Sequence, residues 1–201
     1  MLLPMCMNTR RMAPRVERLP CIGVVLAGGQ SSRMGQDKAL LCWQGRPLIE
    51  RQVATLRAAG VDEVCVSGER PGYAGVPDAT PHRGPLGGLE GVARAIARDA
   101  DLLLIPVDMP LLQPALLQRL RDEQPAARSL MFADHVLPMR WRLDAAGREV
   151  LLQLLRLDDP RQHSLRGLHQ ASQGELVALE ACDMAQLVDC NTPSQWNEVA
   201  G

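Results

Sequence analysis

The stretch that decides the fold is Leu26–Lys38, with the sequence LAGGQSSRMGQDK. It follows the apolar run Cys21–Val25, which is typical of a short buried strand. Glycines after a strand let main-chain N–H groups surround an anion closely, because no Cβ intervenes. Arg33 can bind phosphate oxygens with its forked guanidinium, and Lys38 supplies a compact positive charge. The stretch therefore predicts a polyphosphate-binding loop, since an ordinary polar loop would need neither cation.

The spacing in this loop differs from the two best-known phosphate loops. A P-loop has a hydroxyl residue after its lysine, whereas Ala39 follows Lys38 here, and the glycines do not fit the dinucleotide pattern G-x-G-x-x-G. The stretch instead resembles the signature L-A-G-G-x-S-x-R-M-G-x-D-K of nucleotidyltransferases. Within that group it is similar to the molybdenum cofactor guanylyltransferases, the MobA family. Every defined position of the signature is matched.

A second motif, PVDMP at residues 106–110, follows a continuous apolar run that is typical of a central parallel strand. The resemblance implies that Asp108 binds the metal, in a context that the family commonly writes C-D-x-P, with Val107 in place of the cysteine. One or two carboxylates together with phosphate oxygens are ligands that Mg²⁺ prefers. Taken alone, an aspartate here could simply cap a turn.

A third motif is Asp78 followed by GPLGGL at residues 84–89, which matches an aspartate and a G-P-L-x-G element of the family. These glycines would let a helix N-terminus approach an anion, or they could serve only tight packing. Ser67 stands where the family usually has an asparagine that contacts the nucleotide. Asn191–Pro193 resembles the family's N-T-P element, but a capping box with Thr192 and Gln195 explains most of it.

The resemblance assigns roles to residues from all of these places. It implies that the catalytic residues are Lys38, Arg33 and Asp108. It implies that the nucleotide is bound by Leu26, Ala27, Gly28, Gly29, Lys38, Ser67, Asp78 and Asp108. For an anionic second substrate, the candidates are His135 and Arg140, or Arg161, His163 and Arg166, although a solvated surface is the commoner role for such charges.

Strand-like and helix-like patterns alternate from residue 21 onward. We expect strands near 21–25, 61–67 and 101–107, an antiparallel pair at 128–133 and 135–143, and helices at 47–59, 86–99, 114–123 and 145–156. This order predicts an α/β fold, a three-layer, Rossmann-like nucleotidyltransferase sandwich with a mostly parallel central sheet. Ligands bind outside the carboxyl ends of such strands, so the glycine loop, Ser67, Asp78 and Asp108 should share one rim.

Composition restricts the class of protein. With 201 residues and no visible linker, we expect a single nucleotidyltransferase domain at 21–201, preceded by a disordered extension at 1–20 that lacks a signal-peptide pattern. A net charge of −1 argues against a protein that binds nucleic acid, and no apolar run is long enough to span a membrane. The 6 cysteines lack metal-ligand spacing, so we expect reduced thiols in a cytoplasmic protein.

The resemblance implies transfer of GMP from GTP to Mo-molybdopterin with release of pyrophosphate, with Mg²⁺ as cofactor. Molybdoenzymes or other proteins of cofactor biosynthesis would be further partners. One alternative is the related cytidylyltransferase, which typically shows L-A-A-G and G-D-Q-P where this chain has Gly29 and PVDMP. Another small-molecule nucleotidyltransferase, such as a sugar-nucleotide pyrophosphorylase, is disfavoured by the short chain. An alternative of another class is a non-catalytic nucleotide-binding carrier.

Overall fold

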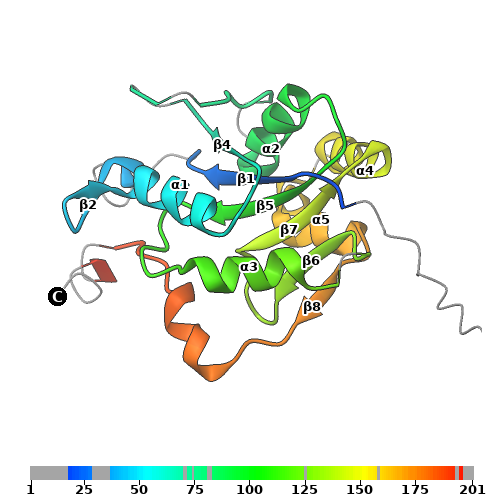
Figure 1. The fold of residues 1–201 in the computed structure, drawn as a ribbon. Coiled ribbons are helices and arrows are strands. Elements are labelled where there is room, and N and C mark those ends of the chain that lie inside the picture. Colours follow the sequence, from blue (N-terminus) through cyan, green and yellow to red (C-terminus); the bar gives the residue numbers. More distant parts are fainter. Residues whose placement is uncertain are drawn as a thin grey trace, which may run out of the picture.

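A six-stranded sheet forms the centre of the protein in the computed structural model (Figure 1). The structure describes residues 18–28, 37–69, 72–73, 75–80, 83–124, 126–157, 159–192 and 195–196. In spatial order the strands are β4 (Glu63–Ser67), β1 (Cys21–Leu26), β5 (Ala100–Pro106), β7 (Met139–Leu143), β6 (Ser129–Phe132) and β8 (Glu175–Val177). Only β7 runs against its sheet neighbours. This confirms the mostly parallel sheet and the antiparallel pair.

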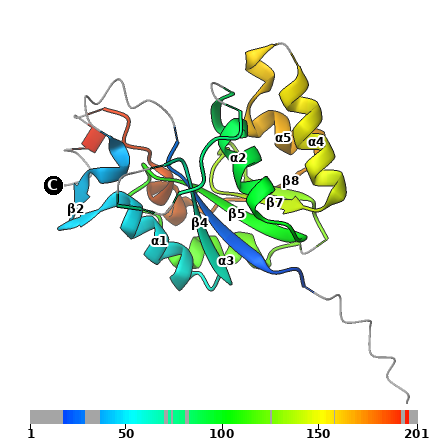
Figure 2. The ribbon, with the colours of Figure 1, turned by 90° about the horizontal axis from the view of Figure 1, so that it is seen from above.

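Helices cover both faces of the sheet, as the view from above shows (Figure 2). One face packs against α1 (Leu48–Ala58) and α3 (Pro114–Asp122). The other packs against α2 (Gly84–Ala95), α4 (Ala145–Arg156) and α5 (Leu165–Ala171).

Alternate residues of one strand supply both cores. In β5, Leu103 and Ile105 face the first set of helices, and Leu102 and Leu104 face the second. All four side chains are fully buried, because parallel strands between two helical layers expose neither face. The three-layer sandwich is confirmed.

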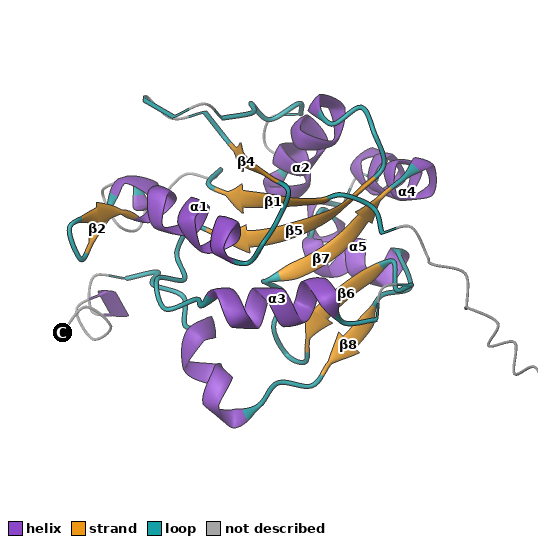
Figure 3. Ribbon diagram, in the orientation of Figure 1, coloured by secondary structure: helices purple, strands orange, loops and turns teal. Residues whose placement is uncertain are grey.

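Short elements complete the fold (Figure 3). A two-stranded hairpin of β2 (Cys42–Trp43) and β3 (Arg46–Pro47) precedes α1. Three 3₁₀ helices are η1 (Lys38–Leu40), η2 (Pro160–Gln162) and η3 (Ala181–Leu187). None of the helices in the described part of the chain is long and apolar enough to cross a membrane.

Residues near the beginning of the described chain contact the domain. Pro20 accepts a main-chain hydrogen bond from Asp101 at 2.9 Å, and Arg18 donates to the carbonyl of Arg121 at 2.9 Å and to the carboxylate of Asp122. These residues fall within the stretch expected to be an extension. The remainder of that expectation, at 1–17, lies outside the described residues.

Arg140 is not available to a second substrate, which corrects one expectation. Its side chain is only 1% exposed, and its guanidinium donates to the carbonyls of Arg121, Glu123, Gln124 and Ala127 at 2.7–3.4 Å. These carbonyls end α3 and begin the following turn, where a cation is favourable. Burial lowers the pKa of this guanidinium. The sequence could not show that the guanidinium of Arg140 is buried against the C-terminal end of α3.

Replacing Arg140 by Met should lower the free energy of unfolding by about 3 kcal/mol, because buried carbonyls lose their donor. Urea unfolding measures this effect. Arg156→Met is the control, since Arg156 is an exposed residue of α4. Equal losses in the two variants would contradict the role given to Arg140.

Candidate active site at the carboxyl ends of β1, β4 and β5

Three parallel strands end in one row. Leu26, the last residue of β1, is in register with Ser67 of β4 and with Pro106 of β5. The main-chain N–H of Ala27 then donates to the carbonyl of Ser67 at 3.0 Å, so the chain leaves the sheet at this row. Asp108 follows two residues after β5. The structure thus brings the ends of all three strands to the same rim, as the order of elements predicted.

Lys38 and Asp108 meet at this rim. Lys38 Nζ lies 2.9 Å from Asp108 Oδ2 and also donates to Asn191 Oδ1. Both charged side chains are mostly shielded, with exposed fractions of 15% and 20%. Asp37 fixes the turn that carries Lys38, because its carboxylate accepts from the N–H of Ala39 at 3.0 Å. An ammonium and a carboxylate therefore converge on one point, where a phosphate chain and a cation could bind together.

Asn191 is a site residue whose contact with Lys38 the sequence reasoning missed. The expected capping box is present: Gln195 N–H approaches Thr192 Oγ1 at 3.3 Å, and Gln195 Oε1 accepts from Asn191 N–H at 2.9 Å. The side chain of Asn191 then remains available to accept from Lys38 and to donate to Asp189 Oδ2 at 2.5 Å. The resemblance to N-T-P was the signal, but the cap already accounted for it.

Main-chain and side-chain bonds fix the loop of Asp108. Its carbonyl accepts from the N–H of Cys190 at 2.9 Å. From α1, Gln52 Nε2 donates to the carbonyl of Met109 at 2.8 Å, and Arg51 Nε donates to that of Pro110 at 2.6 Å. Gln52 is buried, so this contact is protected from water. Hydrogen bonds from α1 and from Cys190 therefore fix the position of the loop that carries Asp108.

The surroundings of the Cys190 thiol disfavour its nucleophilic thiolate form. Burial raises its pKa, and the carboxylates of Asp108 and Asp189 raise it further. A protonated thiol attacks phosphorus and carbon centres poorly. Cys190 acts through its N–H and its packing.

Asp78 reaches the rim over a surface of glycines on α2. A Cβ added to Gly88 would overlap Ser67 Oγ and lie 3.1 Å from Asp78 Oδ1, and one on Gly28 would lie 3.7 Å from that same oxygen. Gly91 passes equally close beneath the carbonyl of Pro77. Both alternatives given for these glycines are thus present: they pack tightly, and they bring the N-terminus of α2 close to the rim. Asp78 remains exposed, whereas Ser67 is 2% exposed and faces α2.

Replacing Gly88 by Ala should raise the KM for the nucleotide expected at this rim roughly tenfold, because the new methyl group displaces Ser67 at the strand end and Asp78 beside it. Steady-state kinetics measure the KM, and a thermal melt measures the stability of the variant. Gly147→Ala is the control: its methyl group would overlap the carbonyl of Arg142, far from the rim, so it should lower stability and leave the KM unchanged. A normal KM in Gly88→Ala would remove Asp78 from nucleotide binding.

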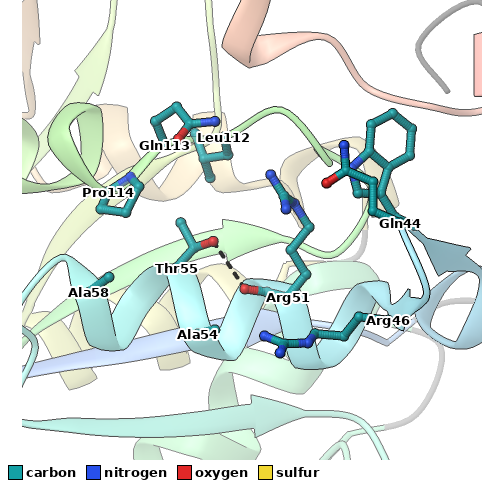
Figure 4. Close-up of a pocket in the computed structure, with 10 residues that line it drawn as sticks. Gln44, Arg46, Arg51, Ala54, Thr55, Ala58, Leu112, Gln113 and Pro114 are labelled. Atoms are coloured by element: carbon teal, nitrogen blue, oxygen red, sulfur yellow. Dashed lines mark hydrogen bonds between the residues drawn. The ribbon is translucent and has the colours of Figure 1, made fainter. Parts of the chain in front are cut away.

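Two clefts open near the site. The first, of about 370 Å³, lies between α1, the β2–β3 hairpin and the start of α3 (Figure 4). It is polar, with Arg46, Arg51 and Gln113 in its lining, and contains none of the predicted site residues. The second, of about 400 Å³, begins at Asp108 and continues to Asp134, His135 and Asp189.

The other predicted residues are placed as follows. Gly29 and Arg33 lie outside the described residues. His163 is 5% exposed, and its Nε2 lies 2.8 Å from the carbonyl oxygen of Leu157, which can only accept, and 3.1 Å from Arg83 Nη1, so the contacts of its ring are made within the fold. Arg161 and Arg166 are exposed and line neither cleft.

One further group could hold a metal ion by geometry among the described residues, at Glu180, Cys182 and Asp183. Arg119 offsets part of the negative charge of this cluster, with its guanidinium 3.4 Å from Asp183 and 3.8 Å from Glu180. Exposed acidic groups of this kind are common without a bound metal.

Comparison with known proteins identifies the family. Residues 23–165 match the model of the MobA-like NTP transferase domain. A molybdenum cofactor guanylyltransferase of Xanthomonas euvesicatoria is 50% identical over 180 residues, which cover 90% of this chain and 94% of that relative. One of Pseudomonas paraeruginosa is 33% identical over 87% of this chain and 91% of its own length.

The fold is shared with solved structures. A nucleotidyl transferase from Methanothermobacter thermautotroptrophicus superposes with a TM-score of 0.64 at 23% identity, over 90% of this chain and 96% of that one. The matched segment contains β1, the glycine surface of α2 and the loop of Asp108. The chain therefore belongs to the family of MobA-like NTP transferase domains.

Proposed function

We propose that the protein transfers GMP from GTP to Mo-molybdopterin and releases pyrophosphate. Membership of the family and the names of both relatives, molybdenum cofactor guanylyltransferases, support the reaction class and the substrates. The observation that carries the proposal is the 2.9 Å contact between Lys38 Nζ and Asp108 Oδ2. It means that one bound triphosphate can touch both residues.

The donor set at the rim fits a magnesium ion. Asp108 offers hard carboxylate oxygens beside a position open to phosphate, and the nearby Asn191 offers an amide oxygen. When bound, Mg²⁺ would supply charge neutralisation on the phosphate oxygens. Asp108 would hold the ion, and Lys38 would then turn its ammonium toward the phosphates.

The remaining work is positioning and charge stabilisation by the chain. Lys38 and Arg33 would stabilise the charge that develops on the leaving pyrophosphate. The main chain from Leu26 to Gly29 would surround the phosphates. Asp78, whose carboxylate lies near Gly28, would also bind the nucleotide. The buried Ser67 would support this strand end. A phosphate monoester is already a nucleophile near neutral pH, so the acceptor needs no general base.

A nucleotide competition assay tests the proposal. Purified full-length protein is incubated with Mg²⁺, Mo-molybdopterin and GTP, CTP, ATP or UTP in turn, and the dinucleotide product and pyrophosphate are measured. We expect product with GTP and loss of activity when EDTA removes the metal. Use of CTP without GTP would show a cytidylyltransferase instead. Tight GTP binding without pyrophosphate release would favour the non-catalytic carrier.

A further inference from the structure

Apart from Asp108, the residues that line the cleft beside it have no role in the nucleotide site described above. The cleft is lined by the end of β5 and the loop after it (106–109), by the connection between β6 and β7 (134–137), and by Leu187 and Asp189. Its volume of about 400 Å³ is large enough for a bicyclic ring. We propose that this cleft is the acceptor subsite, and that Asp134 recognises a flat heterocycle with neighbouring N–H groups. The inference rests on the proposed function.

The position of the cleft suits the attacking substrate. Asp108 is shared: its carboxylate contacts Lys38, which is held by Asn191, and it also lines the cleft. Among the described residues neither Lys38 nor Asn191 lines the cleft itself. In-line displacement at phosphorus needs the nucleophile and the leaving group on opposite sides. With pyrophosphate at Lys38, an acceptor in the cleft approaches the α-phosphorus from the side of Asp108.

The lining of the cleft determines the class of ligand. Its apolar side chains, among them Met109, Val136 and Leu137, suit the faces of a flat ring. The carboxylates of Asp134 and Asp189 are acceptors only, so they repel a triphosphate and favour a ring edge that presents N–H donors. The 2-amino-4-oxo edge of a pterin has two adjacent N–H donors that one carboxylate can accept together. Shape and hydrogen bonding therefore favour the ring of the acceptor over the phosphates of GTP.

Asp134 is the carboxylate best placed for this recognition. Among the described residues none donates a hydrogen bond to its exposed side chain, whereas Asp189 already accepts from Asn191 at 2.5 Å. Asp134 has a φ of 65° in the turn after β6, and the next N–H, of His135, donates to the carbonyl of Phe132 at 3.1 Å. The turn thus places the main chain of Asp134 at the cleft before any ligand binds, which lowers the entropic cost of binding.

The test compares KM values in Asp134→Asn. Asparagine keeps the shape and tolerates positive φ, so the turn is preserved while the charge and one acceptor are lost. Full-length protein is assayed with Mg²⁺, GTP and Mo-molybdopterin, and each substrate is varied in turn. We expect the KM for molybdopterin to rise about tenfold, with the KM for GTP unchanged within about twofold. Asp99→Asn, an exposed aspartate before the opposite end of β5, should change neither value.

A second variant tests the cleft through another side chain. His135→Ala removes a half-buried ring from the lining, and we expect the KM for molybdopterin to rise again without a change for GTP. An unchanged acceptor KM in both variants overturns the assignment while the proposed function stands. A raised KM for GTP alone also overturns it, because the cleft would then bind guanine. If the unmodified protein transfers no GMP, the proposed function fails, and this assignment with it.

Discussion

Replacing Asp108 by Asn is expected to reduce turnover about a thousandfold and to leave most of the GTP affinity in place. Asparagine preserves the shape of the side chain and one oxygen, but it carries no charge to hold Mg²⁺ against competing water. Main-chain bonds keep the loop in position, because Cys190 N–H still donates to the carbonyl of residue 108 and Gln52 to that of Met109. The loss should therefore be chemical and not structural.

Single-turnover kinetics and calorimetric titration with GTP separate these two effects. The expected pattern is a large fall in the rate of pyrophosphate release and a change in the GTP dissociation constant of less than about tenfold. Asp99→Asn serves as the control for removal of a negative charge near the same strand. Wild-type turnover in Asp108→Asn would remove this residue from the mechanism. Loss of GTP binding would mean that Asp108 acts mainly in affinity.

Most of the sandwich could be predicted because its central elements carry strong local patterns. Residues 101–107 form an uninterrupted apolar run, and the structure places β5 at Ala100–Pro106, buried on both faces. The helix expected at 86–99 instead spans Gly84–Ala95, since the proline at position 85 suits the first helical turn. Boundaries of this kind depend on tertiary contacts that the local pattern does not contain.

The elements after α4 could not be predicted. The strand β8 has only three residues, two of them exposed, so it shows no clear alternation. The helix α5 spans seven residues, and it depends on contact with α4 and β6 in addition to its Ser164 N-cap. Short elements at the edge of a sheet depend on neighbours that are distant in the chain.

The residues of the candidate site likewise divide into those that could be predicted from the sequence and those that could not. Lys38, Asp78 and Asp108 could be predicted because each belongs to a motif that follows a strand or precedes a helix. Gln52 and Arg51 could not, since each is an ordinary residue of an amphipathic helix whose partner is a carbonyl 57 or 59 positions away. Main-chain acceptors carry no sequence signal, so residues that support a site are harder to predict than those that form it.

Replacing Lys38 is expected to lower kcat/KM for GTP by about a thousandfold with Met and by nearly as much with Arg. Lys38 is the only lysine in the chain, and the other 21 of its 22 lysine and arginine residues are arginines. Its Nζ lies between Asp108 Oδ2 and Asn191 Oδ1, both within hydrogen-bond distance. A planar guanidinium is larger than this space and cannot turn between the two oxygens and a phosphate as an ammonium can. Arg57→Lys, at an exposed position of α1, is the control for the exchange of one cation for another.

The single lysine also permits a direct chemical test. A lysine-selective acylating reagent can modify only Lys38 and the α-amino group, and mass spectrometry of peptides distinguishes the two. Because the ammonium would bind the triphosphate, GTP with Mg²⁺ should protect Lys38 and leave the α-amino group reactive. At a saturating GTP concentration, protection should persist in Asp108→Asn, since most of the GTP affinity is expected to remain in that variant. Modification of Lys38 at an equal rate with and without GTP would contradict the proposed site, because a free amine cannot neutralise a bound pyrophosphate.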